Sequence, residues 1–230
     1  MVRELKVHRK MTIKSFSEYL SRDNDDVLRM SDHDFVEEEF SDFVLRPIGI
    51  ERIEISNVVF DRCLVKSGLC VIRKGVFLRN VVMTDFSCRD GLHISAEVGL
   101  ENFTISGNKC PSVIVIRRQS DGSKIDEIYS GIGTALDISD YSGEVSITGV
   151  PANIVNINPD QHVVIRAELL SSVDWKSNGF SPLSYWRLMA RKVLAEKASE
   201  GIFSFPSKTA NNYAQSVSEL DILRKQGVVS

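Results

Sequence analysis

The chain has 230 residues, 43% of them hydrophobic and 26% charged, with a formal net charge of −3 at pH 7. These values are typical of a soluble globular protein that buries a sizeable core in one domain, alone or with appendages. They exclude a membrane-spanning chain, because no run of about 18 or more apolar residues is present.

The N-terminal segment MVRELKVHRKMTIK is basic, but it lacks the apolar stretch of a secretory signal. The four cysteines have no CxxC or Cys/His spacing that would indicate a zinc site; they are Cys63, Cys70, Cys88 and Cys110. We therefore expect a cytoplasmic protein with reduced thiols and without a metal or other cofactor.

Residues 18–42 carry most of the negative charge. They hold ten acids and two bases, so this segment has a charge of −8 and the rest of the chain a charge of +5. Such a segment argues against nucleic-acid binding. It is typical of a solvated surface or of one that meets a basic partner.

Within this segment, SDHDFVEEEFSDFVL (31–45) is predicted to be a helix that caps the N-terminal end of the fold. Acids in its first turn suit the helix dipole. One face would carry the apolar residues Val36, Phe40, Phe43 and Val44. We therefore assign residues 1–47 to an N-terminal segment that contains this acidic capping helix.

The next stretch repeats itself. When Asn57, Asn80 and Asn102 are set in register, they lie 23 and 22 residues apart and five apolar columns align with them. Within each strand these columns alternate as β pleating requires. The columns are Ile55/Leu78/Leu100, Val58/Val81/Phe103, Phe60/Met83/Ile105, Leu69/Leu92/Ile114 and Val71/Ile94/Ile116.

A period near 22 residues with several short strands per period is typical of a parallel β-solenoid. Equivalent residues of successive coils would stack about 4.8 Å apart, and the three Asn amides would form a hydrogen-bonded ladder. Weaker copies follow Lys124, and we expect about five or six coils over residues 48–170. These copies place Ile125, Leu136, Ile138, Val145, Ile147, Val163 and Ile165 in strands.

The stretches GLCVI, RDGLHI and PSVIVI each follow an N-x-apolar strand. They resemble the repeats of pectate-lyase-like parallel β-helices over about residues 50–170. The resemblance implies a mainly β fold, a right-handed parallel β-helix. Pentapeptide-repeat solenoids are the near alternative, but their A-(D/N)-L-x-x rhythm is absent from this sequence.

Residues 171–230 are predicted to be a helical extension packed on the solenoid. One amphipathic helix begins at Pro182 and ends before Gly201; a second follows Ser216 and ends before Gly227. An apolar stripe of outward residues on the solenoid needs a cover. We expect the helix 182–200, which contains Trp186, to lie along the side of the solenoid over this stripe of Val59, Val82 and Thr104.

The resemblance implies that an active site, if the chain has one, would use carboxylates on an outer face. The candidates are Asp61, Asp85, Asp90 and His93. However, Asp90 precedes Gly91 in a turn, where Asp is common for local hydrogen bonding, and no glycosidase or lyase motif is intact. Cys88 and Cys110 occupy equivalent positions and are expected to be buried hydrophobic residues rather than a disulfide.

We therefore expect a non-catalytic, monomeric binding protein of the immunity or antitoxin type, which neutralises a basic toxin such as a nuclease. The contact residues would be Glu37, Glu38, Glu39 and Asp42. Neither a nucleic acid nor a membrane is expected as a partner. Two alternatives stay open: a carbohydrate-active or sugar-binding β-helix that uses the Asp/His face, and a phage or surface-structure component that assembles through the solenoid.

Overall fold

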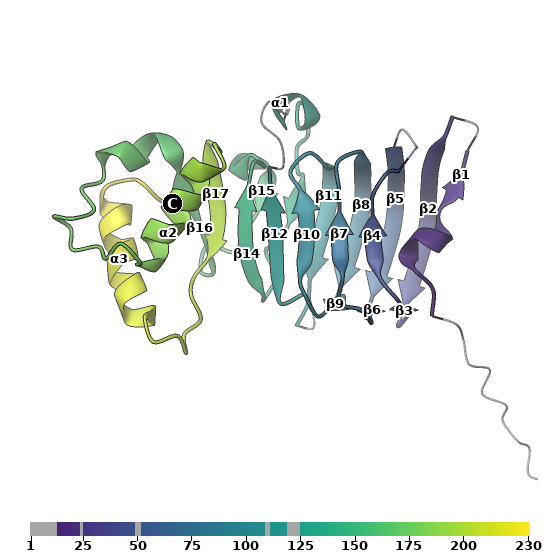
Figure 1. Ribbon diagram of the computed structural model, residues 1–230, viewed down its shortest axis with the longest axis horizontal. Helices are drawn as coiled ribbons and strands as arrows, with labels where there is room; N and C mark the ends of the chain where they lie inside the picture. The colour runs from purple at the N-terminus through teal and green to yellow at the C-terminus, as the bar shows by residue number, and fades with distance from the viewer. Residues whose placement is uncertain (1–12, 24, 49–51, 109–110, 119–124) are drawn as a thin grey trace, which may run out of the picture.

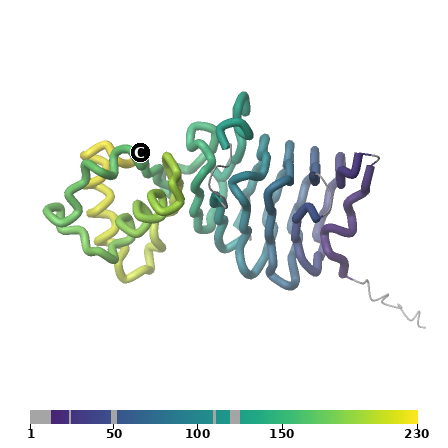
Figure 2. Tube along the Cα trace, turned by 45° about the horizontal axis from the view of Figure 1, so that its top comes forward, coloured from purple at the N-terminus to yellow at the C-terminus, as the bar shows by residue number. Residues whose placement is uncertain are grey.

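The computed structural model describes residues 13–23, 25–48, 52–108, 111–118 and 125–230. The chain forms a parallel β-solenoid of about five turns, followed by a smaller helical module at its C-terminal end (Figures 1 and 2). Most turns contain one strand from each of two seven-stranded sheets, and the first three turns add a strand of a short third sheet between them.

Sheet 1 contains, in spatial order, β1 (Ser21–Arg22), β2 (Val27–Val36), β5 (Arg52–Asp61), β8 (Val76–Thr84), β11 (Gly99–Ser106), β13 (Leu136–Asp137) and β15 (Val155–Asn156). Sheet 2 contains β4 (Phe43–Leu45), β7 (Cys70–Ile72), β10 (Leu92–Ser95), β12 (Val113–Arg117), β14 (Glu144–Thr148), β17 (Glu200–Ser204) and β16 (His162–Arg166). Sheet 3 contains β3 (Glu39–Phe40), β6 (Leu64–Val65) and β9 (Ser87–Cys88).

The predicted core columns of sheet 1 are confirmed by the strand register. Phe60 lies beside Met83 of the next coil, and Met83 lies beside Ile105, with all three side chains fully buried. The columns that contain Leu78 and Val81 align in the same way. Inward apolar side chains therefore stack along the whole solenoid and form one continuous core.

The predicted register of sheet 2 is wrong by one residue in the second coil. Cys70, not Leu69, pairs with Leu92, and Leu69 is 47% exposed. The reason is the length of the turn, because Asn57 to Cys70 spans 13 residues whereas Asn80 to Leu92 spans 12. An extra turn residue moves every later side chain of that coil to the opposite face.

Hydrogen bonds join the repeated Asn side chains into a ladder. The Nδ2 group of Asn80 donates to Oδ1 of Asn57 at 2.9 Å, and Asn102 donates to Asn80 at 3.0 Å. At the end of the column, Asn57 donates to the carboxylate of Asp32 at 2.9 Å. All four residues have φ between 51° and 54°, a left-handed conformation that Asn and Asp tolerate better than most residues. The column therefore bends each strand of sheet 1 at the same place.

Replacing Asn80 with alanine is expected to lower the free energy of unfolding by about 2 kcal/mol. The change removes two side-chain hydrogen bonds and leaves a Cβ-bearing residue in the left-handed region. Asn80→Gly is the control, because it removes the same hydrogen bonds without the backbone strain and should cost about half as much. Urea unfolding measures both variants. Equal losses would show that backbone strain contributes nothing here.

The predicted helix at 31–45 is wrong, because this segment is the first coil of the solenoid. It contains the end of β2 together with β3 and β4, and β2 pairs in parallel with β5 from Val27 to Val36. Left-handed bends at Asp32 and Glu37 interrupt the strand alternation. The resulting apolar spacing imitates a helical one, although Val36 is 51% exposed. The solenoid consequently begins before residue 48.

A short 3-10 helix, η1 (Phe16–Tyr19), caps the N-terminal end instead. Phe16 is fully buried, and its ring stacks on that of Phe43 with a centroid distance of 4.5 Å. The hydroxyl of Ser15 donates to the carboxylate of Asp42 at 2.8 Å, which holds the start of η1 against the first coil. The cap therefore closes the core with an aromatic side chain.

The fourth coil departs from the predicted repeat. Ile125 begins a short helix, α1 (Ile125–Ile128), rather than a strand. Leu136 pairs with Phe103 in sheet 1, so it belongs to the column directly after the Asn ladder and not to a column of sheet 2. Lys124 and Cys110 lie outside the described residues. The inserted helix moved the register beyond what a fixed period could follow.

The C-terminal residues form a second core that closes the far end of the solenoid. Strand β17 runs antiparallel between β14 and β16. Around it pack the 3-10 helix η3 (Ala167–Ser172) and two helices, α2 (Tyr185–Ala195) and α3 (Tyr213–Lys225). Val163 and Ile165 of β16 point into this second core, whereas Val164 points into the first. A further 3-10 helix, η2 (Ala152–Ile154), precedes β15.

The prediction that helix 182–200 covers the side of the solenoid is wrong. Helix α2 is shorter, and it packs on η3, β17 and α3 at the end of the solenoid. Trp186 is fully buried there, and its Nε1–H donates to the carbonyl of Ser216 at 2.7 Å. The stripe of Val59, Val82 and Thr104 is half-buried. Contact between neighbouring coils suffices to limit its exposure.

Candidate functional site

The residues proposed for an acid–base site lie at two corners of the solenoid. Asp61 ends β5 and forms an ion pair of 2.8 Å with Arg62. Asp85 follows β8 and accepts a hydrogen bond of 2.7 Å from the backbone N–H of Asn108. Both acids contribute to raising the pKa of Arg62, for which the hydrogen bond to Glu37 is the largest cause. Asp61 and Asp85 therefore belong to a local charge cluster around Arg62.

The other two candidates lie beyond the opposite end of β9. Asp90 is exposed in the turn before β10, and His93 Nε2 lies 3.2 Å from its carbonyl oxygen. His93 is half-buried in sheet 2 between Val71 and Val115, not beside Cys70 as the sequence register indicated. Since β9 separates the two pairs along the coil, the four candidates do not line one cleft.

The acids proposed for partner binding line one corner of the first coil. Glu37 forms an ion pair of 3.0 Å with Arg62, and Glu39 forms one of 2.7 Å with Lys66. Both carboxylates are exposed, so these pairs contribute little to stability. Their negative charge therefore remains available at the surface, although the second coil partly neutralises it.

Glu38 and Asp42 are less accessible than their neighbours. Both are half-buried, and Asp42 accepts hydrogen bonds from Ser15 and, at 3.1 Å, from Ser41. Burial and then the charge of Glu38 raise the pKa of Tyr19. Asp42 therefore serves the N-terminal cap, and the exposed charge of this corner comes mainly from Glu37 and Glu39.

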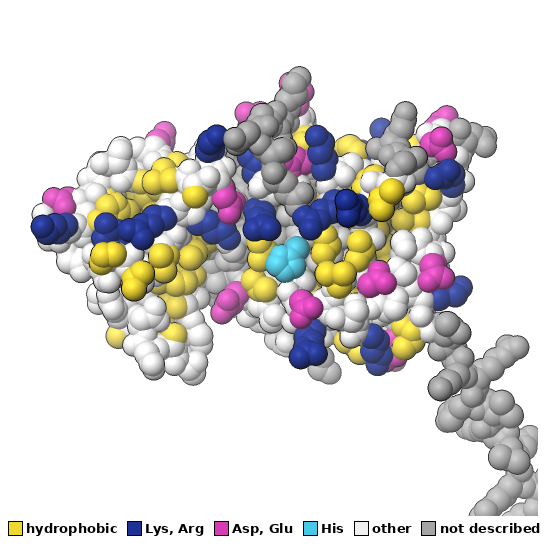
Figure 3. All heavy atoms as spheres, in the orientation of Figure 1, with side chains coloured by type: hydrophobic (Ala, Val, Ile, Leu, Met, Phe, Trp, Pro, Cys, Tyr) yellow, Lys and Arg dark blue, Asp and Glu magenta, His cyan; other side chains and the backbone are white. Residues whose placement is uncertain are grey.

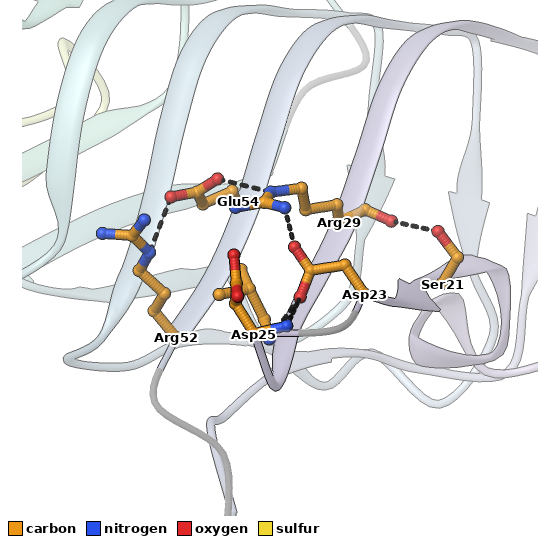
Figure 4. A network of polar contacts seen from close by, with 7 residues as sticks. Ser21, Asp23, Asp25, Arg29, Arg52 and Glu54 are labelled. Atoms are coloured by element: carbon orange, nitrogen blue, oxygen red, sulfur yellow. Dashed lines mark hydrogen bonds and ion pairs between the residues drawn. The ribbon is translucent and has the colours of Figure 1, made fainter.

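A charge network ties the edge of sheet 1 together (Figure 4). Arg29 of β2 bridges Asp23 and Glu54, and the Glu54 carboxylate also accepts from Arg52 at 2.7 Å. The hydrogen bond from Arg29 is the largest cause that lowers the pKa of Glu54. The network neutralises part of the acidic segment and fixes β2 to the second coil.

Beside this network, sheet 1 carries a groove of about 430 Å³ that the sequence did not reveal. Phe77 is 44% exposed in it, with the Arg52 guanidinium 6.0 Å from its ring centroid. Gly99 on the next coil makes room for the ring, because a Cβ at that position would overlap it. The available signal was an aromatic residue at an outward strand position, next to a glycine one coil later.

A second groove, of about 590 Å³, lies where the solenoid meets the C-terminal module. Its lining includes Glu144, Asp160, Lys208 and Tyr213. Nearby, His162 is 1% exposed, and burial lowers its pKa to about 4. Its Nδ1 accepts from the backbone N–H of Asn158 at 3.2 Å. The imidazole is therefore neutral near pH 7 and acts as a structural acceptor.

The outer face of sheet 2 combines cationic and apolar side chains. Val44, Val71, His93 and Val115 lie side by side across four coils. Lys and Arg side chains form a band along this face, with hydrophobic side chains beside it (Figure 3). The band is the opposite in charge to the corner of Glu37 and Glu39.

Among the described residues, no group of three or more His, Cys, Asp or Glu side chains could hold a metal ion. No helix in the described part of the chain is long and apolar enough to cross a membrane. No family model matches the chain, and neither the curated proteins nor the solved structures contain a match. The class of protein, a parallel β-solenoid with a C-terminal helical module, therefore follows from its architecture alone.

Proposed function

We propose that this solenoid is a non-catalytic binding protein that holds a basic protein at its acidic end. We define the acidic end as the exposed carboxylates of the first coil: Asp32, Asp34, Glu37 and Glu39. The observation that carries the proposal is their position on the terminal coil, where a partner can approach without meeting another coil. Opposed charge would give fast and specific association.

The outer edge of β2 adds a second means of recognition. Strand β1 pairs only with Arg29 and Leu28 of β2, and no described strand pairs with the outer edge of residues 30–36. Unpaired backbone N–H and C=O groups can accept an added strand from a partner. Exposed Val36 lies on the same stretch. Charge would then steer the partner, and backbone pairing would hold it.

The finer form of the proposal is an antitoxin-type protein that acts in the cytoplasm and neutralises a basic toxin, such as a nuclease. The acidic end would occupy the cationic substrate cleft of the toxin. Cys63, Cys70 and Cys88 are buried free thiols, and burial raises the pKa of Cys63 to about 11. Unreactive free thiols suit a reducing compartment.

Reversing Asp34, Glu37 and Glu39 to lysine is expected to abolish retention of the basic partner. The immobilised protein is incubated with lysate of its own source and washed in a salt series, and mass spectrometry identifies what remains. The wild-type chain should retain one basic protein at low salt and lose it at high salt. Loss of the surface ion pairs of Glu37 and Glu39 should cost only about 1 kcal/mol each or less, so the variant should stay folded.

The matched control reverses Asp160 and Asp221, two exposed acids outside the acidic end. This variant should retain the partner as the wild-type chain does. Equal retention by all three proteins would contradict the assignment of the acidic end. Failure of the wild-type chain to retain any basic protein would contradict the proposed function. Circular dichroism confirms that each variant is folded.

A further inference from the structure

Two arginines flank a serine in one column on the outer face of sheet 2. Ser95 of β10 lies beside Arg117 of β12, and the same register places it beside Arg73 of the second coil. With neighbouring strands about 4.8 Å apart, the two arginine backbones lie roughly 10 Å apart. Ser95 is fully buried, whereas Arg73 is half-buried and Arg117 is exposed. The short serine leaves the space between the two guanidinium groups to a groove.

This groove has a volume of about 410 Å³. It is lined by Arg73, Arg117, Arg118 and Glu196, the last from the end of α2. Its size is in the range of small-ligand sites rather than of a groove for a macromolecule. The C-terminal module therefore completes a site that the solenoid alone would leave open on one side.

The charges around the groove do not balance. The Lys192 ammonium lies at the same junction, where it donates to the hydroxyl of Ser146 at 2.5 Å. Burial lowers the pKa of Lys192, and the charge of Arg117 adds to this effect whereas Glu196 opposes it. Three arginines and one lysine stand against two carboxylates, Glu196 and the buried Glu97 beneath Ser95. The excess is 4 − 2, or two positive charges.

We propose that this groove binds the phosphate-monoester group of a small ligand. A guanidinium presents paired N–H donors that match the oxygens of a phosphate, and one guanidinium stands on each side of the groove. A phosphate monoester carries close to two negative charges at pH 7 and so balances the local excess, which a monocarboxylate would not. The Glu196 carboxylate can accept from a hydroxyl of the same ligand. This site is independent of the acidic end.

The test titrates the full chain with glycerol 3-phosphate by isothermal calorimetry at fixed ionic strength. Glycerol and acetate serve as ligand controls. Saturable binding is expected for glycerol 3-phosphate alone. Arg73→Gln and Arg117→Gln should each weaken it by about tenfold or more, because each removes a charge-assisted contact. Arg79→Gln is the matched control, since Arg79 is an exposed arginine of sheet 1 paired with Glu101 at 2.6 Å. Its affinity should not change.

A further variant separates charge from folding. Glu196 accepts from the Thr148 hydroxyl, and Glu196→Gln keeps an acceptor oxygen there while it removes a negative charge. Phosphate binding should therefore tighten, which a variant that damages the fold would not produce. The proposal is overturned if glycerol 3-phosphate gives no saturable heat, if acetate binds equally well, or if Arg79→Gln weakens binding as much as Arg73→Gln. Binding confined to vesicles that contain phosphatidic acid would also overturn it.

Discussion

Phe60→Ala is expected to lower the free energy of unfolding by about 3–5 kcal/mol, the usual cost of removing a large buried aromatic side chain. Phe60 is fully buried and stands between the N-terminal cap and the second and third coils. Its ring stacks on that of Phe35 at a centroid distance of 5.2 Å. Edge contacts with centroid distances of 5.3–6.2 Å join it to Phe16, Phe40, Phe43 and Phe86. Alanine would leave a cavity that several rigid rings cannot fill.

Phe77→Ala is the matched control, since Phe77 lies on the neighbouring strand β8 but points outward and is 44% exposed. It should cost about 1 kcal/mol or less, because most of its ring surface gains little from folding. Urea unfolding followed by circular dichroism gives both values. Similar losses for the two variants would contradict the assignment of the aromatic cluster as the centre of the N-terminal core.

Trp186→Ala is expected to cost about 3–5 kcal/mol, measured in the same way. The indole is fully buried in the second core and satisfies the carbonyl of Ser216 in α3. Its loss removes both apolar contact and a buried hydrogen bond. Strand β17 belongs to the same module and pairs with β14 of the solenoid. The damage should therefore extend to the end of the solenoid.

Leu188→Ala on the same helix provides the comparison. Leu188 is 38% exposed, so its truncation should cost about 1 kcal/mol. Both variants keep the helix propensity of α2 nearly unchanged, because alanine is the best helix former. If Trp186→Ala cost no more than Leu188→Ala, the C-terminal module would not be a packed core.

The sequence determined the periodic part of the solenoid. Asn57, Asn80 and Asn102 identify the bend, and the columns around Leu78, Val81 and Met83 identify the inward face of sheet 1. These features repeat because neighbouring coils meet the same environment, so a side chain that suits one coil suits the next. A local pattern is then sufficient evidence for a long-range arrangement.

The sequence could not determine the places where one coil differs from the next. One extra turn residue placed Cys70 in the core in place of Leu69. Left-handed bends at Asp32 and Glu37 gave the first coil a helical spacing, although its partner is β5. Pairing with a strand about 25 residues away overrides local propensity, and the sequence of the segment does not carry that information.

The candidate sites depended on the tertiary structure still more. The sequence placed acids in the first coil, but only the fold showed that Glu37 and Glu39 remain exposed while Asp42 holds the cap. Arg73 and Arg117 are 44 residues apart in the chain and meet around Ser95 only because two coils bring them together. Composition and periodicity thus decided the solenoid, because it repeats the same local contact. The surfaces were decided by packing between coils and by the C-terminal module, since those contacts occur once.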